Sequence, residues 1–573
     1  MTKHGRLCLI FCNFIHFPLT FGKMILSKRN LLFLFYLLHS LNSIGHPPRT
    51  FEKHDYLHGK LNNNRTWFDV TMYNITLKVT PNKKYIQGYN IISYKVLKPA
   101  NLMQLDIHGL IKIDSIVYNQ KQLKYTRDSS IILIKMPHQR KNSCHQLHVY
   151  FSGNPLIAKK APWDGGFVFT KDSSGNDWVG LACQGLGAST WLPCKDHLSD
   201  EADSVNINLQ VPSHLTGVSN GKLIDSINLN NGYTEFRWQV RYPINNYNIT
   251  VNIGNYKHFS DEYVAKYNNI NKPLSLDYYV LDYNLNKAQK HFEQVKTMMA
   301  CYEKYFGPYP FWNDGYKLVE TPYWGMEHQS AVSYGNDYSN TRWDFDFIII
   351  HESAHEWFGN SITSFDPAEL WLHESFTTHA EAVFVECNMD KDAAHKYLKM
   401  QKRNIENKHP LLGTSNVYFH DFEDNDIYYK GSWMLYTIRH VIDNDTLWFN
   451  SLLDYCNTFK YANISTKQCI DFWVNRTGKN LAPIFEQYLT QAQLPVFEYS
   501  LTPGENEILE LKYRWVNVVK GFEMPIEATI SKNDYQPLTP TTKWRVVDLN
   551  YFNPKEFKIK IDYYLIETRQ IVD

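Results

Sequence analysis

A pentapeptide of the form H-E-x-x-H constrains the fold of this chain more than any other feature. It places His351 and His355 four positions apart in the segment 346–360, which is densely apolar, contains no Pro and has a Gly near its end. These properties predict a buried helix. The two imidazoles would then project from one face, about one turn apart, which is the separation that two ligands of a single Zn²⁺ need. Glu352 lies beside them, where it can act as a base on a bound water.

A third ligand is predicted nineteen positions after His355, where Glu374 lies in a second helical segment, 371–381. Two His and one Glu leave one position of a tetrahedral zinc ion open, which is the catalytic rather than the structural arrangement. We therefore expect one Zn²⁺ per chain. The alternative is that His351 and His355 are ordinary surface or core histidines and Glu374 is a solvated carboxylate. In a chain with 23 His, a chance H-E-x-x-H arises at roughly the few-per-cent level.

Length, composition and charge narrow the class of protein. At about 150 residues per domain, 573 residues predict roughly three or four domains. A hydrophobic content of 43% and a charged content of 20% are typical of globular proteins. A net charge of +1 provides no field to attract nucleic acid or an anionic membrane, so nucleic-acid binding is disfavoured.

The N-terminus has the pattern of a secretory signal. Two basic residues precede the apolar run 31–38, and Ser43 or Gly45 offers a small residue for cleavage. We expect a signal peptide over 1–45, with Met24 as an alternative start, and an exported, periplasmic or extracellular protein. The apolar run is too short to cross a bilayer of about 30 Å, so membrane association would require an uncleaved signal.

Cysteine usage gives a weaker indication. Seven Cys follow the predicted signal, and none of them forms a C-x-x-C pair. Such a dispersed set predicts at most a few optional disulfides rather than a disulfide framework. Cys183 and Cys194 flank a motif described below and are the pair that such a bridge would join.

Hydrophobic periodicity divides the remaining chain into the domains of a multidomain α+β protein. Short alternating runs such as 67–79 and 91–96, separated by Gly, Pro and Asn turns, predict an N-terminal antiparallel β domain over 46–257. The pattern then changes to a mainly helical domain over 258–493, which contains both zinc-site segments. An amphipathic helix is predicted over 287–305 in this second domain.

A third domain is predicted at the C-terminus. Alternation of apolar and polar residues returns in 508–515 and 557–564, which indicates a small β-sandwich over 494–573. No internal repeat, heptad pattern or low-complexity linker separates the three domains. We therefore expect them to pack closely.

Three further stretches carry a resemblance to a known family. They are Trp324-Gly325-Met326-Glu327-His328-Gln329, Cys183 to Asp196, and Tyr428-Tyr429-Lys430-Gly431. Together with the metal motif they resemble the gluzincin aminopeptidases of the M1 family, especially its short, three-domain, exported bacterial forms, over about residues 60 to 570. The resemblance implies a thermolysin-like catalytic domain and hydrolysis of the N-terminal bond of peptides.

The first stretch resembles the family's G-A-M-E-N motif. The resemblance implies that Glu327 binds the free α-amine of the substrate by a charge-assisted hydrogen bond, and that Gly325 and Met326 line the same site. Gly325 lets the backbone approach a bound peptide closely. Trp324 stands where the family usually has Gly, and His328 where it has Asn. These two departures put the shape of the subsites in doubt.

The other two stretches imply a substrate-binding glutamine and a catalytic tyrosine. Gln184 matches the glutamine that helps to bind the N-terminal residue. Tyr428 matches the tyrosine that donates to the oxyanion, and Tyr429 is its decoy neighbour. Glu381, two turns after Glu374 on the same helix face, resembles the family's carboxylate that orients a zinc-bound His.

These residues together predict a zinc aminopeptidase that acts on peptides with a free N-terminus, with Glu352 as the general base. We expect the protein to be a monomer. Among hydrolases, a zinc endopeptidase or an epoxide hydrolase is the alternative, because a His₂Glu site does not itself select an exopeptidase. Glu327 argues against the endopeptidase. From another class, the alternative is a non-catalytic surface receptor or adhesin on the same scaffold. Such a protein would be marked by a broken ligand or base, whereas both are present here.

Overall fold

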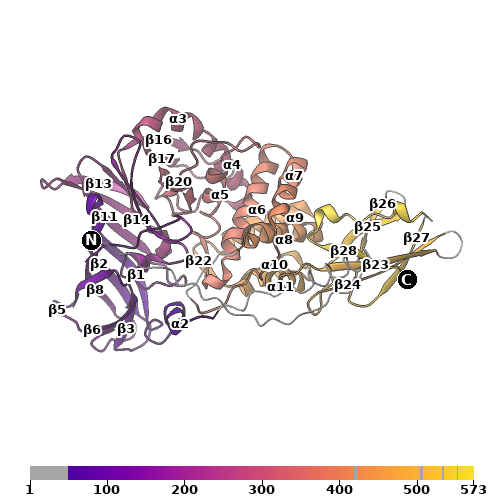
Figure 1. Ribbon diagram of the computed structural model, residues 1–573, viewed down its shortest axis with the longest axis horizontal. Coiled ribbons are helices and arrows are strands. Elements are labelled where there is room, and N and C mark those ends of the chain that lie inside the picture. Colours follow the sequence, from indigo (N-terminus) through magenta and orange to yellow (C-terminus); the bar gives the residue numbers. More distant parts are fainter. Residues whose placement is uncertain (1–49, 418–423, 504–507, 532–533, 551–552, 573) are drawn as a thin grey trace, which may run out of the picture. The chain divides into compact units, whose positions relative to one another are not determined.

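The computed structural model describes residues 50–417, 424–503, 508–531, 534–550 and 553–572 (Figure 1). The chain divides into two compact units, Met1–Phe51 and Glu52–Asp573, and every element described below belongs to the second. The predicted signal peptide over 1–45 and the alternative start at Met24 lie outside the described residues.

The N-terminal part of the second unit is built from strands, as predicted. A short helix, α2 (Lys53–Gly59), precedes them. The strands are, in chain order, β1 (Phe68–Thr80), β2 (Tyr85–Val96), β3 (Leu102–Asp106), β4 (Ile111–Tyr118), β5 (Lys121–Gln122), β6 (Tyr125–Asp128), β7 (Ile131–Lys135), β8 (Cys144–Gly153), β9 (Gly166–Lys171), β10 (Asp177–Ala182), β11 (Ser204–Pro212), β12 (Thr216–Val218), β13 (Lys222–Asn228), β14 (Tyr233–Val240) and β15 (Asn252–Gly254).

Three sheets form from these strands. The largest has eight strands in the order β13-β14-β11-β1-β2-β8-β4-β5, and the others have the orders β12-β15-β10-β9 and β3-β7-β6. In β1 every second residue from Tyr73 to Val79 is buried, which is the alternation of a strand with one face on the core. The pairing is antiparallel except between β1 and β11, which run parallel with Ile75 opposite Ile207. The β domain is therefore not purely antiparallel.

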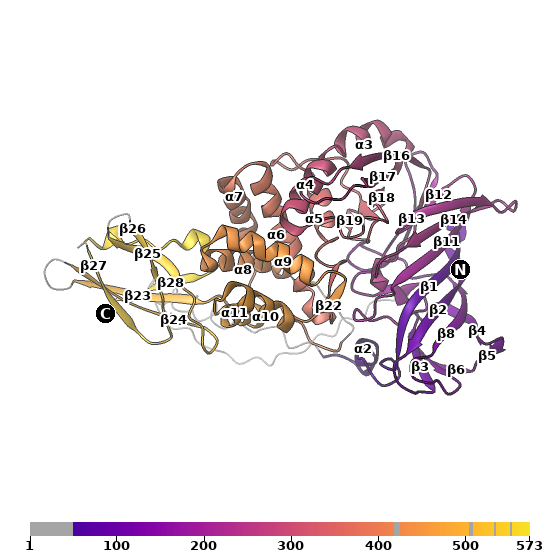
Figure 2. The same ribbon diagram turned by 180° about the vertical axis from the view of Figure 1, so that it is seen from behind.

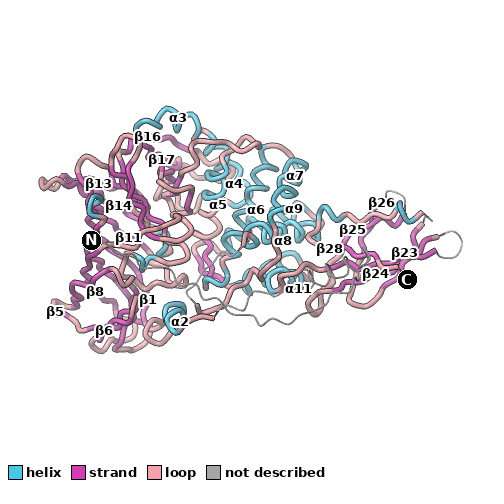
Figure 3. The backbone as a smooth tube through the Cα atoms, in the orientation of Figure 1, coloured by secondary structure: helices cyan, strands magenta, loops and turns pink. Residues whose placement is uncertain are grey.

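The following part of the chain is mainly helical, and Figure 3 shows its helices in cyan. Its elements are β16 (Tyr256–Tyr263), β17 (Leu274–Leu281), α3 (Leu285–His291), α4 (Gln294–Phe306), β18 (Tyr316–Glu320), β19 (Gly325–Met326), β20 (Val332–Tyr334), α5 (Phe347–Ala354), β21 (Ile362–Ser364), α6 (Trp371–Asn388), α7 (Lys391–Gln401), α8 (Asp426–Ile442), α9 (Asp445–Thr458), β22 (Ala462–Ile464), α10 (Thr466–Thr477) and α11 (Ala482–Thr490).

One five-stranded sheet, in the order β16-β17-β18-β20-β19, precedes the zinc-site helices. β16 contains the predicted boundary between residues 257 and 258, and the domain limits as a whole stay predictions. The single helix predicted over 287–305 is interrupted by a turn at Phe292, which separates α3 from α4. At this turn the Phe292 ring packs edge-on against Tyr334 of β20, with 5.1 Å between ring centroids.

Helix α6 lies in the middle of the helical core, beside α8 in both views (Figures 1 and 2). Every residue of α6 from Trp371 to Val385 is buried. A helix that is buried all round has neighbours on every side, so the side chains that it carries are held rigidly. Among the described residues, however, no helix is both long and apolar enough to cross a membrane.

The C-terminal part returns to strands, as predicted. They are β23 (Val496–Pro503), β24 (Leu509–Val516), β25 (Ile526–Ser531), β26 (Asp534–Leu538), β27 (Arg545–Leu549) and β28 (Glu567–Gln570), in a sheet of order β27-β24-β23-β28 and a hairpin of β25 and β26. The strand predicted over 557–564 is wrong. Its aromatic residue Tyr563 stacks instead on His395 of α7 and packs against His440 of α8, each with 4.6 Å between ring centroids. Tertiary packing thus overrides the alternating pattern here.

Candidate metal centre and active-site cavity

Helix α5 is anchored at its first turn. The side chain of Asp346 caps the helix by accepting a hydrogen bond from the backbone N–H of Ile348 at 2.9 Å. The helix ends at Ala354, so His355 follows it directly rather than lying within it as predicted. Its φ of −59° and ψ of −22° still continue the helical path, and its ring centroid lies 5.0 Å from that of His351. The predicted spacing of the two imidazoles therefore holds.

The Nε2 atoms of both histidines converge on one carboxylate oxygen. Glu374 Oε2 lies 3.7 Å from His351 Nε2 and 3.3 Å from His355 Nε2. One ligand atom from each of the three residues falls within 4.8 Å of the others. Glu374 is in the first turn of α6, so two separate helices supply the three side chains.

The other ring nitrogens of the two histidines are engaged elsewhere. His351 Nδ1 lies 2.7 Å from Glu381 Oε1, and His355 Nδ1 lies 2.9 Å from the carbonyl oxygen of Phe358. A carbonyl oxygen can only accept, so His355 carries a proton on Nδ1, and Nε2 is the ring nitrogen that faces Glu374. Partners of this kind orient metal-binding histidines.

Glu381 is itself fixed by two residues of α7. Its Oε2 accepts hydrogen bonds from the Tyr397 hydroxyl at 2.5 Å and from Gln401 Nε2 at 2.8 Å. The carboxylate therefore holds the His351 ring from a rigid position. Sequence reasoning identified Glu381, but neither Tyr397 nor Gln401 belongs to a motif that could have marked it.

The donor set fits a divalent cation. Glu374 Oε2 is buried and accepts no hydrogen bond within the described part of the chain. The surrounding cavity, of about 190 Å³, is lined by four glutamates and by no Lys or Arg, namely Glu327, Glu352, Glu374 and Glu381. A carboxylate oxygen that accepts no hydrogen bond, close to two imidazole nitrogens in a cavity lined by four glutamates, is what a bound zinc ion would satisfy.

Glu352 projects into the same cavity. Its carboxylate lies under the strand β19, and a Cβ added to Gly325 would be 2.7 Å from Glu352 Oε1. Glycine is thus required at 325 for the strand to pass over the carboxylate. Burial raises the pKa of Glu352 to about 7, with the charges of Glu327 and Glu374 adding to the effect against the two histidines.

Glu327 is held by residues from both domains. Its Oε1 accepts hydrogen bonds from Gln184 Nε2 at 2.7 Å and from the Tyr247 hydroxyl at 3.1 Å. Asn360 Nδ2 donates to the backbone oxygen of Glu327 at 2.8 Å. Tyr247 and Asn360 were missed by sequence reasoning, because Tyr247 comes from a segment with no distinguishing pattern and Asn360, although it ends the segment 346–360, is not part of the H-E-x-x-H pattern. Burial, followed by the charge of Glu374, raises the pKa of Glu327.

Gln184 reaches the site from the loop after β10. Gly185 and Gly187 follow it with φ of 80° and 78°, values that favour glycine. Its Nε2 donates to Glu374 Oε1 at 3.1 Å as well as to Glu327, so it links the carboxylates of Glu327 and Glu374. The optional bridge between Cys183 and Cys194 is not formed, and both are free, buried thiols.

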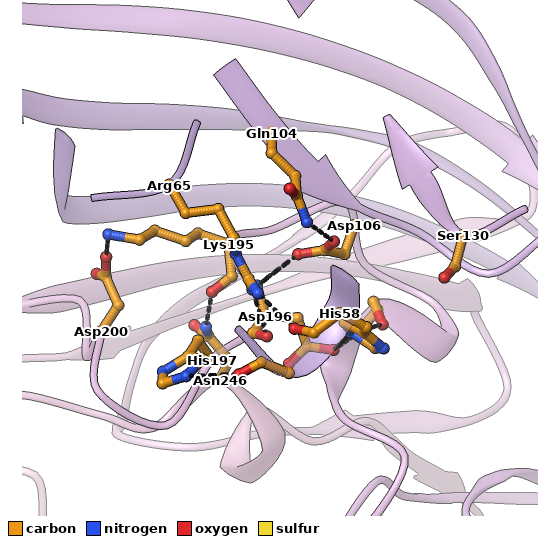
Figure 4. A network of polar contacts seen from close by, with 12 residues as sticks. His58, Arg65, Gln104, Asp106, Ser130, Lys195, Asp196, His197, Asp200 and Asn246 are labelled. Atoms are coloured by element: carbon orange, nitrogen blue, oxygen red, sulfur yellow. Dashed lines mark hydrogen bonds and ion pairs between the residues drawn. The ribbon is translucent and has the colours of Figure 1, made fainter. Parts of the chain in front are cut away.

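A buried network of charged residues anchors that loop (Figure 4). Arg65 Nη2 lies 3.0 Å from Asp106 Oδ2 and donates to the backbone oxygen of Asp196 at 2.6 Å. The backbone N–H of Asp196 donates to the same Asp106 oxygen at 3.2 Å. Lys195 pairs with Asp200 and donates to the backbone oxygen of Phe68 at 2.7 Å. The loop that carries Gln184 is thereby fastened to β1 and β3.

Tyr428 lies in the first turn of α8 and lines the cavity. Its ring centroid is 6.1 Å from that of His351. Burial raises the pKa of Tyr428 well above its ordinary value, and the charges of Glu374 and Glu327 add to the effect, so the phenol stays a donor. Tyr429 also lines the cavity, with its ring 6.5 Å from that of Tyr428.

Close packing of α8 on α6 accounts for the glycine of the tyrosine motif. A Cβ at Gly431 would lie 1.8 Å from Ser375 Oγ, which no side chain could accommodate. The neighbouring Lys430 donates to the backbone oxygens of Gln491 at 2.9 Å and Ala492 at 2.6 Å, just beyond α11. The motif therefore serves helix packing as well as the cavity.

The two departures from the family motif fall in different environments. Trp324 is 44% exposed and lines the cavity, whereas His328 is fully buried and is not part of the lining. His328 Nδ1 lies 3.0 Å from Ser333 Oγ instead. Of the two departures, Trp324 and not His328 is therefore the one that bears on the shape of the substrate subsites.

The chain is similar to known proteins in both of its larger parts. The model of the peptidase M1 N-terminal domain matches residues 70–247, and that of the peptidase family M1 domain matches residues 290–488. A leucyl aminopeptidase from Saccharolobus solfataricus is 22% identical over 493 residues, covering 81% of this chain and 59% of the relative. The endoplasmic reticulum aminopeptidase 1 of Mus musculus is 24% identical over 302 residues, covering 49% and 31%.

Solved structures agree with the sequence matches. The crystal structure of an M1 zinc metallopeptidase from Deinococcus radiodurans has a TM-score of 0.63 and 19% identity, and the match covers 74% of this chain and 95% of that one. This likeness shows a shared fold. The fold and the convergent His₂Glu cluster define a metallopeptidase scaffold, and the chain belongs to peptidase family M1. It spans about half the length of the curated relatives that it matches.

Proposed function

We propose that this protein is a zinc aminopeptidase that removes the N-terminal residue of peptides. The observation that carries the proposal is the position of Glu327. Its carboxylate, together with Glu352 and His355, places ligand atoms within 4.8 Å of one another, so an amine-binding group lies directly beside the metal cluster. A substrate whose ammonium group binds Glu327 has room for only one residue before the bond that is cleaved.

His351, His355 and Glu374 would hold the zinc ion. When bound, zinc supplies Lewis-acid polarisation of the scissile carbonyl and lowers the pKa of water. No Lys or Arg of the cavity lining competes for these ligands.

The remaining chemistry falls to the chain's own side chains. Glu352, whose pKa is raised to about 7, is suited to take a proton from the attacking water and to pass it to the leaving nitrogen. Tyr428 would donate a hydrogen bond to the oxygen on which negative charge develops. Glu327 and Gln184 would bind the α-ammonium group and the N-terminal residue.

The proteins that this chain is similar to support this proposal. The relatives above are aminopeptidases, and a mutant of the Deinococcus radiodurans enzyme has been solved with a Tyr-Ser-Ala substrate, with a TM-score of 0.63 and 18% identity. A non-catalytic receptor would need neither base nor ligands, and an endopeptidase would need an open cleft where Gln184 and Tyr247 fix Glu327. Neither alternative is favoured by an observation of its own.

A panel of aminoacyl-coumarin substrates tests the proposal, with N-acetylated versions as matched controls. We expect hydrolysis of the free amines only, and loss of activity on chelation with recovery on adding zinc. Glu352→Gln should retain zinc and lose hydrolysis, because it removes the base and keeps all three ligands. Zinc loss in that variant would contradict the assigned roles.

The exopeptidase assignment has a separate test. Glu327→Ala should abolish cleavage of free-amine substrates, because the ammonium group loses its carboxylate. Undiminished turnover in Glu327→Ala, or cleavage of acetylated substrates by the wild type, would contradict the aminopeptidase assignment.

A further inference from the structure

A row of aromatic rings runs from the outer edge of the cavity to the metal cluster. The Trp163 and Trp324 rings lie 6.4 Å apart, centroid to centroid, with an interplanar angle of 38°. Trp324 stacks on Phe347 at 5.5 Å and 23°, and Phe347 stacks on His351 at 5.3 Å and 26°. All four residues line the cavity.

The two tryptophans are exposed although their neighbours hold them in place. Trp163 is 51% and Trp324 is 44% exposed, which is unusual for adjacent large apolar side chains and marks a binding surface. Trp324 Nε1 donates to Asn336 Oδ1 at 2.9 Å. The turn before Trp163 is fixed by Asp164 Oδ2, which accepts from the backbone N–H of Lys160 at 2.8 Å.

The direction of a bound peptide follows from the order of residues along β19. Glu327, which would bind the α-ammonium group, comes just after this strand, and Gly325 passes over the base Glu352. Trp324 comes just before it, at the opposite end of the strand from Glu327. Because extended chains rise by about 3.3 Å per residue, the three steps from Glu327 to Trp324 span about 10 Å, which is the length of the first three residues of a peptide whose amine binds Glu327.

The charge at this edge selects among the side chains that stack on tryptophan. Lys160 Nζ already lies over the Trp163 ring, 5.4 Å from its centroid. A second cation in the peptide would be repelled there, whereas an aromatic ring has no such penalty and gains edge or offset stacking.

We propose that Trp163 and Trp324 form a specificity surface for an aromatic side chain at the second or third residue of a peptide substrate, after the bond that is cleaved. The inference rests on the proposed function for the direction of the peptide. It predicts that the enzyme prefers one class of sequence on the leaving side of the bond, independently of the N-terminal residue.

Tetrapeptides test this surface. We would compare Ala-Ala-Ala-Ala with the peptides that carry Phe at the second or the third position, and use alaninamide, which has no second residue, as a substrate that cannot reach the tryptophans. Wild type should favour one Phe peptide by about fivefold to tenfold in kcat/KM, chiefly through KM. Trp324→Gly and Trp163→Ala should each reduce this preference towards one and change alaninamide hydrolysis by less than about twofold.

An exposed aromatic residue outside the cavity provides the matched control. Tyr267 is 56% exposed, and Tyr267→Ala should leave the preference intact. Calorimetric binding of the same peptides to the Glu352→Gln protein gives a readout that needs no turnover, with the same expected preference and the same loss in both tryptophan variants.

The outcomes separate the two proposals. Absence of any alanyl-coumarin hydrolysis by the zinc-loaded wild type would contradict the proposed function, while the calorimetric preference would still decide the specificity surface. Equal affinity for the Phe and Ala peptides, or a preference that survives both tryptophan substitutions, would overturn the inference even in an active aminopeptidase.

Discussion

Two buried clusters of charged residues in this protein differ in how their charges are balanced. In the anchor network around Arg65, Asp106 and Asp196, cations and backbone N–H groups face the carboxylates. In the metal-site cluster, Glu327, Glu352, Glu374 and Glu381 line one cavity with no Lys or Arg. Both clusters come from segments distant in the sequence, and both are buried. Only the second has negative charge to spare.

The pKa values show the consequence of that difference. Burial acts to raise the pKa of Asp196, but hydrogen bonds from His58 and Ser189 outweigh it and hold the pKa below its usual value. Burial raises the pKa of Glu352 to about 7, and nothing fully compensates it. A balanced buried network therefore stabilises the fold, whereas an unbalanced one is prepared for a cationic ligand.

The largest contrast is expected from removing one carboxylate of the unbalanced cluster. Glu374→Ala should lose bound zinc and lower kcat/KM by more than about two orders of magnitude. A loss of two orders of magnitude is the upper range for residues that only support a metal ligand, whereas Glu374 is itself a proposed ligand. Metal-free Glu374→Ala should also unfold at a lower temperature than chelated wild type, because the substitution removes the carboxylate that pairs with His351 and His355. Metal analysis and thermal unfolding check both points, and full zinc occupancy would break the comparison.

A substitution in the balanced cluster should lower the stability of the fold and leave the zinc content unchanged. Arg65→Met leaves Asp106 buried without its cation and should lower the free energy of unfolding by about 3 to 5 kcal/mol, without changing the zinc content. Denaturant unfolding measures the change, and Arg545→Met, at an exposed position, is the control. A stable Arg65→Met protein that lacks zinc would show that the two clusters are not independent.

Tyr428 sharpens the comparison of the two clusters because the hydrogen bond that it is proposed to donate requires no charge on its side chain. Tyr428→Phe should lower kcat by about two to three orders of magnitude while zinc content and stability stay unchanged, since the donor to the developing oxyanion is removed. The neighbouring Tyr429→Phe should stay within about tenfold of wild type, well short of the loss of a direct donor. If the two substitutions have equal effects, the assignment of Tyr428 as the donor is wrong.

The smallest effect is expected at Glu381, which touches the metal site through His351. Glu381→Gln should weaken zinc binding by about tenfold to a hundredfold. Competition with a fluorescent chelator measures the affinity, and activity at saturating zinc should recover most of its wild-type value. Unchanged zinc affinity would mean that residue 381, held by Tyr397 and Gln401, orients the His351 ring without the charge of its carboxylate.

The sequence predicts the metal cluster well because helical periodicity ties residue number to direction in space. A separation of four positions suffices to bring the Nε2 atoms of His351 and His355 together, although α5 ends one residue early. Glu374 lies on a second helix, so its place beside the two histidines depends on the packing of α6 against α5 as well. Local spacing carries the information for the two histidines only.

Residues brought in by tertiary contacts had no such signal. Trp163 and Trp324 are separated by more than a hundred and fifty positions, and Tyr247 meets Glu327 only because the two domains pack together. The parallel pairing of β1 with β11 and the packing of Tyr563 on α7 are likewise invisible to alternation of apolar residues. Periodicity predicts which face of a helix or strand is buried, but not which element packs against that face.

The contact between Gly431 and Ser375 has a consequence for how mutations in this protein would be interpreted. Ser375 is adjacent to Glu374, and Gly431 is one helical turn from Tyr428, so a missing side chain sets the gap between the proposed metal ligand and the proposed oxyanion donor. A single methyl group at 431 would wedge the two helices apart. A genetic screen would then score Gly431 as indispensable for catalysis, although it has no functional group to offer.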